Sequence, residues 1–362
     1  MTIPQIVAWM MLMFVPVSWL GVWQHWHPVV LFAVAALGIL PLAKWLSTAT
    51  ETIALVSGPT IGGLLNATFG NATELILALT ALHSGLVGVV KASLTGTLIS
   101  NLLLVLGLAA LLGGWGRTEQ VFPSTVARLN ASTMNLAVIA LLLPTAVALT
   151  TPGIPEVTLQ NLSVAVAVVL LLVYGLSLFF AMKTHSYLYE VSEVEHAGES
   201  VNVPLWVGVL LGVTVLIAVE SEILVDALEV TLETLGLSSL FSGVILLPLI
   251  GSAAEYITAI SVAIKNKMDL AVAVAMGSSL QIALFVAPIL VLAGRWWHQP
   301  MDLSFNPFEL VAVVVAVLIS NSISSDGRSN WLEGSLLMAA YAMIALAFYF
   351  HPVLTNGSLS EG

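Results

Sequence analysis

The chain reads Gly70-Asn71-Ala72-Thr73-Glu74 inside one long apolar segment, and 181 positions later it reads Gly251-Ser252-Ala253-Ala254-Glu255 inside another. The same offset aligns four further pairs of residues: Gly62 with Gly243, Gly96 with Gly277, Thr97 with Ser278, and Ser100 with Gln281. The match runs over more than thirty positions without a gap. Such a match indicates an internal repeat, which is the usual construction of a membrane transporter.

The composition is that of a membrane protein. Of 362 residues, 59% are hydrophobic and only 8% are charged, whereas about a quarter of a soluble domain is charged. The chain contains no cysteine, which excludes disulfides, thiolate metal sites and thiol redox chemistry. The net charge is −11, with only 9 Lys and Arg and no basic cluster, so a nucleic-acid partner is not expected. We expect the protein to be embedded in a lipid bilayer.

Eleven segments are long and apolar enough to cross a bilayer, which requires about 20 residues in a helix. They run over residues 5–23, 28–46, 58–82, 87–113, 128–150, 158–182, 203–226, 239–264, 268–293, 308–324 and 331–350. The repeat pairs helices two to six with helices seven to eleven. An odd number of helices per unit makes the two copies inverted with respect to each other in the membrane.

We therefore expect an all-α integral membrane protein with one extra N-terminal helix and two inverted five-helix repeats. The chain forms a single transporter domain over 1–362. Its parts are the extra helix 1–25, the first repeat 28–182, a linker 183–202, the second repeat 203–350 and a tail 351–362.

The basic residues predict the orientation. If the N-terminus is cytoplasmic, seven of them fall inside: Lys44, Arg117, Arg128, Lys183, Lys265, Lys267 and Arg328. Lys91 and Arg295 then fall outside. We expect a cytoplasmic N-terminus and an external C-terminus. The short N-terminus without a cleavable signal peptide is typical of a multi-pass protein of a prokaryotic plasma (inner) membrane.

Glu74 and Glu255 lie near the middle of their helices. A carboxylate at the bilayer centre costs at least a few kcal/mol, so it normally faces a partner or a wet cavity and marks an ion or proton path. Asn71 precedes Glu74 by three residues, and Ser252 precedes Glu255 by three, so each pair shares a helix face. Gly70 and Gly251 permit an unwound backbone whose carbonyls supply further oxygen ligands.

The following helix of each repeat adds polar groups at helical spacing. These are Thr97, Ser100 and Asn101 in the first repeat, and Ser278 and Gln281 in the second. Carboxylate, amide and hydroxyl oxygens without imidazole or thiolate suit Ca²⁺, Mg²⁺ or Mn²⁺ better than Zn²⁺ or copper. Two carboxylates neutralise one divalent ion, and the sequence places no Lys or Arg beside them. The metal is expected as cargo, with no resident cofactor.

The same pair of acids predicts proton coupling. Two carboxylates close together in a medium of low dielectric constant cannot both stay ionised without a cation. The metal-free site should therefore take up protons, and metal should displace them. Competition between one divalent ion and protons at a shared site is an antiport mechanism.

The linker is the most polar stretch of the chain. It carries Glu190, Glu193, Glu195 and Glu199 without Lys or Arg. Two interpretations stay open: a solvated connector, or an acidic cytoplasmic segment that attracts or senses cations at the mouth of a pathway.

At these residues the sequence resembles the calcium/cation antiporter superfamily, in its proton-coupled calcium exchanger branch. The resemblance rests on residues 58–74, 100–107, 251–255 and 265–282, and it extends over nearly the whole chain. It implies that Glu74 and Glu255 bind Ca²⁺ and exchange protons, with Asn71, Asn101, Ser252 and Gln281 in the lining. That family often has Asn where Ser252 stands and His where Tyr256 stands, which bears on selectivity and pH dependence.

Several alternatives differ in their motifs. Sodium/calcium exchangers typically carry Pro before each acid, where this chain has Thr73 and Ala254. Exchange of Mn²⁺ or another divalent ion uses the same ligand set. An intramembrane hydrolase, and thus an enzyme, would require two intramembrane Asp or a His-Glu-x-x-His motif, and neither is present. A passive cation channel would carry metal without proton counterflow.

Overall fold

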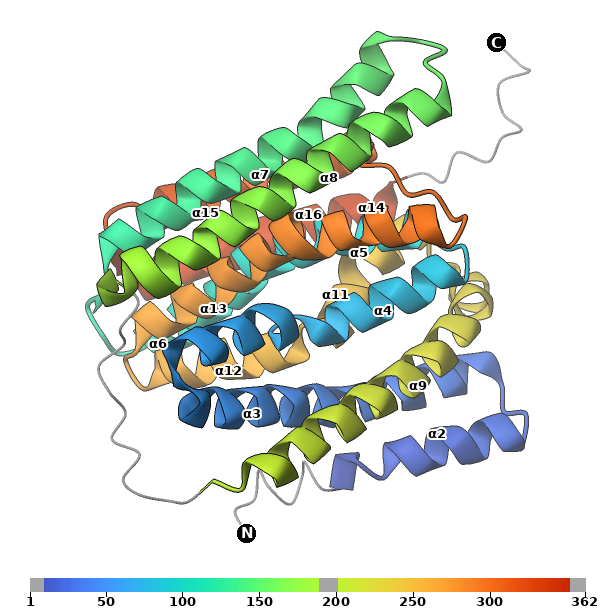
Figure 1. Cartoon of the computed structure of the whole chain (residues 1–362), viewed down its shortest axis with the longest axis horizontal. Helices are drawn as coiled ribbons and strands as arrows, with labels where there is room; N and C mark the ends of the chain where they lie inside the picture. Colours follow the sequence, from blue (N-terminus) through green and yellow to red (C-terminus); the bar gives the residue numbers. More distant parts are fainter. Residues whose placement is uncertain (1–9, 189–200, 352–362) are drawn as a thin grey trace.

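The structure is a computed structural model that describes residues 10–188 and 201–351, nearly all of them in helices (Figure 1). The α-helices are α2 (Phe14–Trp23), α3 (Pro28–Phe69), α4 (Ala72–His83), α5 (Val87–Ile99), α6 (Leu106–Gly114), α7 (Ser124–Thr150), α8 (Glu156–Phe179), α9 (Val203–Leu235), α10 (Ser239–Phe241), α11 (Leu247–Gly251), α12 (Ala253–Ile264), α13 (Met268–Gln281), α14 (Ala287–Trp296), α15 (Pro307–Ser324) and α16 (Trp331–Phe350). π-Helical turns lie at Ser100–Val105, Phe180–Thr184, Ser242–Leu246 and Ile282–Val286, and a 3₁₀ turn at Ser186–Leu188.

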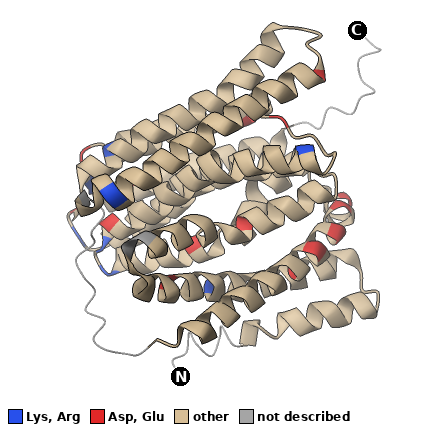
Figure 2. Ribbon diagram, viewed as in Figure 1, with Lys and Arg blue, Asp and Glu red and all other residues tan. Residues whose placement is uncertain are grey.

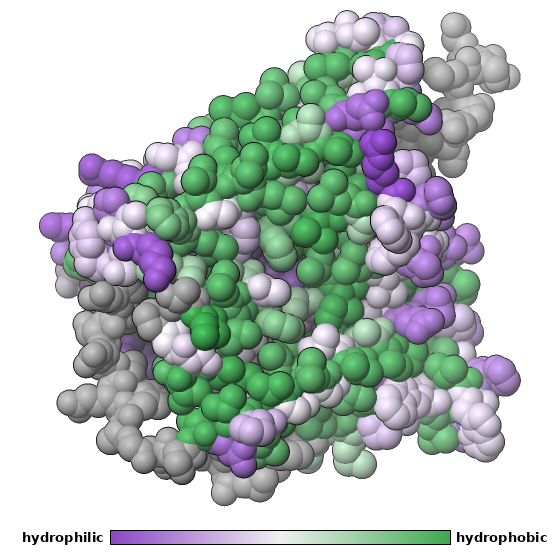
Figure 3. Space-filling view, in the orientation of Figure 1, coloured by the Kyte–Doolittle hydropathy of each residue, from purple (hydrophilic) through white to green (hydrophobic). Residues whose placement is uncertain are grey.

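The helices form a multi-pass membrane protein. In the described ranges eight helices are long and apolar enough to span a bilayer, and the pair Ser239–Gly251 and Ala253–Ile264, bent by 60°, makes a ninth. The apolar helices Phe14–Trp23 and Ala72–His83 are shorter. The described part of each of the eleven expected segments contains helix, although 58–82 and 239–264 are interrupted and the described helix of the first segment is short. Apolar side chains cover the middle of the molecule and hydrophilic ones gather at its two ends (Figure 3).

The second expected segment is longer than predicted. The sequence predicts a helix over 28–46, but the helix continues to Gly58. Its hydroxyl groups donate to carbonyls one turn earlier, for example Thr48 to Lys44 at 2.9 Å and Ser57 to Ile53 at 2.7 Å, so these polar side chains are satisfied within the helix.

Gly58 ends this first limb of α3. Its φ of +78° is a left-handed conformation that glycine adopts easily. The chain folds back here so closely that a Cβ on Gly62 would lie 2.7 Å from the Ala54 carbonyl oxygen. Lys44 consequently lies near the middle of a 31-residue span and not at its cytoplasmic end. The expectation that Lys44 lies at a helix end is therefore wrong, and the inside or outside assignment of the other eight basic residues stays a prediction.

The helix boundaries confirm the repeat. Helices α4 and α12 begin and end at residues that differ by the same 181 positions as the two Glu motifs, and so do the first residues of α5 and α13. In Figure 1 the chain runs from right to left along α5 and α6, and from left to right along α13 and α14. The two copies therefore run in opposite directions.

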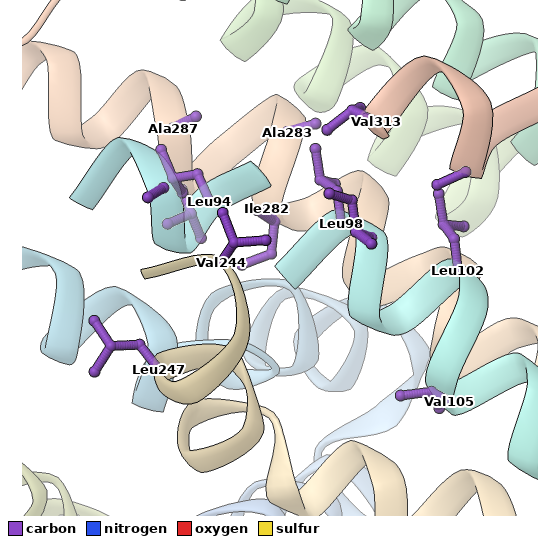
Figure 4. Packing of buried hydrophobic residues seen from close by; sticks show 14 of the residues in the cluster. Leu94, Leu98, Leu102, Val105, Val244, Leu247, Ile282, Ala283, Ala287 and Val313 are labelled. Carbon is purple, nitrogen blue, oxygen red and sulfur yellow. The ribbon is translucent and has the colours of Figure 1, made fainter. Parts of the chain in front are cut away.

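The repeats pack against each other through close helix crossings. A Cβ added to Gly96 of α5 would overlap the Val244 carbonyl, and one added to Gly243 would overlap Ala92. Around this crossing Leu94, Leu98, Val244 and Ile282 pack side by side (Figure 4), and each is at most 4% exposed. Lipid tails are as apolar as these side chains, so close packing through small residues is what holds such helices together.

The loops at one end of the molecule are tied together. A two-stranded antiparallel ladder, absent from the all-α prediction, joins β1 (Gln120–Val121) to β2 (Arg328–Ser329). Arg117 donates to the Ile264 carbonyl at 2.9 Å, next to the Lys265–Lys267 loop. Basic residues gather at this end, the left of Figure 2. Lys91, paired with Asp302 at 2.6 Å, lies towards the opposite end of the 28-residue helix Val87–Gly114.

The orientation can be tested by thiol labelling, because the chain contains no cysteine and single cysteines can be introduced without other changes. We expect Lys265→Cys to react with a membrane-impermeant maleimide only in inside-out vesicles. Arg295→Cys should react only in right-side-out vesicles. Labelling of Lys265→Cys from the outside would reverse the orientation deduced from the basic residues.

Candidate functional site

Each of the two motifs interrupts a helix immediately before its glutamate. Helix α4 restarts at Ala72 after Asn71, whose φ and ψ are −119° and 35°, and Glu74 lies in its first turn. Helix α12 restarts at Ala253 after Ser252, whose φ and ψ are −90° and 20°, and Glu255 lies in its first turn. The N-terminal end of a helix carries a partial positive charge, which favours the ionised form of a carboxylate placed there.

The two interrupted helices meet. A Cβ on Gly251 would lie 3.3 Å from Cγ of Glu74, and one on Gly70 would lie 2.9 Å from Oε1 of Gln281. Each motif glycine thus leaves room for a polar side chain of the other repeat. Glu74 and Glu255 are close enough for their charges to repel each other. Gly251 of the second motif thus packs against Glu74 of the first, while the sharing of one ion by the two acids stays a prediction.

A network of amide and hydroxyl groups connects the repeats beside the acids. Asn71 Nδ2 donates to Gln281 Oε1 at 2.5 Å, and Ser278 Oγ donates to Asn71 Oδ1 at 2.6 Å. Asn101 Nδ2 in turn donates to Ser278 Oγ at 2.9 Å. The network fixes Asn71, which immediately precedes α4, against the second repeat.

Several oxygens at this point are buried without a hydrogen-bond partner. They are Glu74 Oε1, Glu255 Oε2, Ser252 Oγ and Asn101 Oδ1. A buried polar atom left unpaired costs about 1–3 kcal/mol, so the unpaired oxygens of the two acids mark places where a bound positive charge would lower the free energy. In the described part of the chain no group of three or more His, Cys, Asp or Glu lies together, so the charge of the site comes from two carboxylates.

The cavity that leads to Glu255 is much larger than the one beyond Glu74. A cavity of about 440 Å³ reaches Glu255 and is lined by Asn71, Ser278 and Gln281 together with α3 and α12. Val262 and Leu270, which flank the Lys265–Lys267 loop, also line it, so it opens at that end. Beyond Glu74 the structure has a cavity of only about 30 Å³, lined by Ser93, Thr97 and Pro248 among others, which is room for one or two water molecules.

The expected lining residues divide among these features. Asn71, Ser278, Gln281 and Gly70 line the large cavity, and Thr97 and Gly251 line the small one. Asn101 belongs to the amide network. Ser100 lines neither cavity, because it is fully buried and its hydroxyl pairs with that of Tyr256. Glu190, Glu193, Glu195 and Glu199 lie outside the described residues.

Sequence reasoning missed part of the cavity wall. Ser47, Thr50 and Glu51 of α3 line it, and their spacing of three and four residues would have identified one helix face had the helix been extended past residue 46. The sequence also predicted no basic residue near Glu74 and Glu255. Lys44 is close enough to Glu255 for their charges to attract, although no ion pair joins them in the described ranges.

Two further buried acids hold helices together away from this site. Glu220 lies in the interior of α9, because that helix extends to Leu235, beyond the predicted end at residue 226. Glu220 Oε1 accepts from Ser18 of α2 at 2.7 Å. Glu309 of α15 accepts from Thr95 of α5, also at 2.7 Å. Each joins two helices through a hydroxyl, and neither lines the large cavity.

Known proteins match the chain over almost its full length. The family model described as sodium/calcium exchanger protein matches residues 27–183 and 205–350. The chain belongs to this family. It is 63% identical over 359 residues to a Ca²⁺/H⁺ antiporter of Aphanothece halophytica, covering 95% of this chain and 96% of that protein. It is 43% identical over 341 residues to the Ca²⁺/H⁺ antiporter ChaA of Bacillus subtilis, covering 92% and 96% of the two chains.

The fold agrees with a solved structure of a family member. The structure of native YfkE superimposes with a TM-score of 0.83 at 40% identity, covering 94% of this chain and 99% of that one. The exchanger fold therefore applies to both repeats of the chain.

The one-sided access of the site can be tested with single cysteines. Thr258→Cys, on the wall of the large cavity, should react with a small charged thiol reagent applied from the Lys265–Lys267 side. Ser93→Cys, in the small cavity beyond Glu74, should stay unreactive from both sides in the same metal-free vesicles. Equal reactivity of the two cysteines would contradict the difference in access.

Proposed function

We propose that this protein is a secondary active transporter that exchanges cytoplasmic Ca²⁺ for protons by alternating access. The observation that carries the proposal is the meeting of two carboxylates from inverted repeats, with unpaired buried oxygens, at the end of a cavity open to one side. The antiporter names of relatives at 63% and 43% identity support the same exchange.

The binding chemistry follows from the donor set. Glu74 and Glu255 supply two negative charges, which balance one divalent ion. Asn71 and Ser252 supply neutral oxygens, and the interrupted backbone at Gly70 and Gly251 supplies carbonyls. Gln281, Ser278 and Asn101 orient Asn71 through the amide network. Ca²⁺ and protons are cargo in this scheme, and the protein acts as a transporter and not as an enzyme.

Proton coupling follows from the same burial. When Ca²⁺ leaves, the repulsion between the buried carboxylate of Glu74 and the half-buried carboxylate of Glu255 is relieved by binding protons. Ca²⁺ that arrives must displace those protons. Lower pH therefore weakens Ca²⁺ binding, and a proton gradient drives Ca²⁺ towards the more acidic side.

Alternating access requires the cavity to close at one end and to open at the other. In this structure the Glu255 side is open and the Glu74 side is closed by the packing of α4 and α5 with α11. We place the open side in the cytoplasm, the N-terminus inside, the C-terminus outside and the protein in the plasma membrane. Thr73 and Ala254, in place of Pro, favour protons over sodium as the counter-ion.

The central test is the neutral replacement of each acid. Glu74→Gln and Glu255→Gln keep the shape of the side chain but remove a charge and the proton-accepting group. Either should abolish Ca²⁺ uptake into proteoliposomes driven by a pH gradient, together with the Ca²⁺-linked proton flux. The double variant should be no worse than either single one, because the pair acts as a unit.

Two controls keep this result interpretable. Each variant should be verified as folded and inserted, which we expect because a neutral amide is easier to bury than a carboxylate. Wild-type vesicles should be assayed with Ca²⁺, Mn²⁺ and Na⁺ in turn to identify the cargo. A folded single variant that exchanges Ca²⁺ for protons at near wild-type rate would refute the shared site.

A further inference from the structure

One wall of the large cavity belongs to the first limb of α3. Ser47, Thr50 and Glu51 line it, and Asn66 joins them from the limb that returns after Gly58. Glu51 is exposed, and its Oε1 accepts a hydrogen bond from Ser47 Oγ at 2.7 Å. That bond holds the carboxylate against the cavity wall. Glu51 and Glu255 are the two acids of the lining, which contains no Lys, Arg or His.

Along α3, Glu51 lies nearer to the open end of the cavity than Lys44 does. Lys44, whose charge reaches Glu255, precedes Glu51 by seven residues, which is about 10 Å along a helix. A cation that enters from the open end therefore meets the carboxylate of Glu51 before that of Glu255. Clefts lined by one sign of charge between walls of low dielectric constant concentrate counter-ions.

We propose that Glu51 is the first binding station for a divalent cation on its way to Glu74 and Glu255. The station consists of the Glu51 carboxylate with the neighbouring oxygens of Ser47 and Asn66. It holds the ion loosely, because one exposed carboxylate leaves most of the ion's water shell in place. This inference deepens the proposed Ca²⁺/H⁺ exchange and rests on it.

Lys44, which does not line the cavity, adds a positive charge that acts on Glu255. Lys44, Ser47 and Glu51 follow one another at spacings of three and four residues and so lie along one side of α3. Lys44 forms no hydrogen bond or ion pair through its ammonium group within residues 10–188 and 201–351. Its positive charge opposes a divalent ion beside Glu255, and a transport site must bind weakly enough to release its ion. Glu51 therefore increases cation occupancy, and Lys44 decreases it.

The test compares neutral variants of these two residues in proteoliposomes at low ionic strength. Glu51→Gln should raise the apparent KM for Ca²⁺ presented on the cavity side by about threefold to tenfold, with Vmax and the ratio of protons to Ca²⁺ unchanged. Lys44→Gln should lower that KM, which damage to the fold would not do. The double variant should return towards the wild-type value. The differences should shrink in high salt, where exposed charges are screened.

Two matched variants complete the design. Glu51→Asp keeps the charge and should restore the KM. Glu119→Gln removes an acid that is ion-paired to Arg328 at the same end of the molecule but does not line the cavity, and it should leave the KM unchanged. A folded Glu51→Gln with the same KM as Glu119→Gln at low salt would overturn the proposal.

Equilibrium Ca²⁺ binding separates this inference from the proposed function. Purified Glu51→Gln in detergent at low ionic strength should bind Ca²⁺ more weakly than the wild type. If the wild type binds Ca²⁺ but does not exchange it for protons, the proposed antiport fails while the Glu51 comparison stands. If Glu51→Gln binds Ca²⁺ as tightly as the wild type, Glu51 is not a binding station.

Discussion

Two carboxylates from opposite repeats, Glu74 buried and Glu255 half-buried at the end of the large cavity, are the constraint on which the rest of this structure depends. Within residues 10–188 and 201–351 neither glutamate forms an ion pair, although the charge of Lys44 attracts that of Glu255, and one oxygen of each glutamate is without a hydrogen bond. The fold reduces this cost by interrupting two helices, so that the positive end of α4 or α12 lies beside each acid. In the proposed mechanism the remaining cost is relieved when the pair of acids binds either one Ca²⁺ or protons.

The inverted repeat is what brings the two acids together. One motif used twice in opposite directions places its glutamates at related positions on either side of a pseudo-twofold axis. Glycines then allow the interrupted helices to approach, as Gly251 does against Glu74. The amide network from Asn101 to Gln281 crosses the same interface and sets the position of Asn71. Movement of the α3 wall relative to these helices would change access without dismantling the site.

The sequence predicted the features that repeat and missed those that depend on tertiary contacts. The offset between the Glu motifs and the set of oxygen-bearing side chains were readable from residue types and spacing. The helix interruption was expected at Gly70 and Gly251, and the structure has it one residue later, at Asn71 and Ser252. The length of α3 was not, because Thr48, Thr50 and Glu51 lower the hydropathy of a segment whose hydroxyls bond to its own carbonyls. That error removed Glu51 from the cavity and placed Lys44 at the membrane surface. The pairing of Ser100 with Tyr256 joins residues 156 positions apart and left no local pattern.

Proton release on Ca²⁺ binding tests the shared site most directly. Ca²⁺ should be added to the purified protein in a weakly buffered solution while the pH is followed, with the titration repeated from acidic to alkaline starting pH. The shared site requires Ca²⁺ to release up to about two protons, with the number falling towards zero once both carboxylates are ionised beforehand. Apparent Ca²⁺ affinity should rise over the same pH interval. Ca²⁺ binding that releases no protons at any pH, with an affinity independent of pH, would contradict the account.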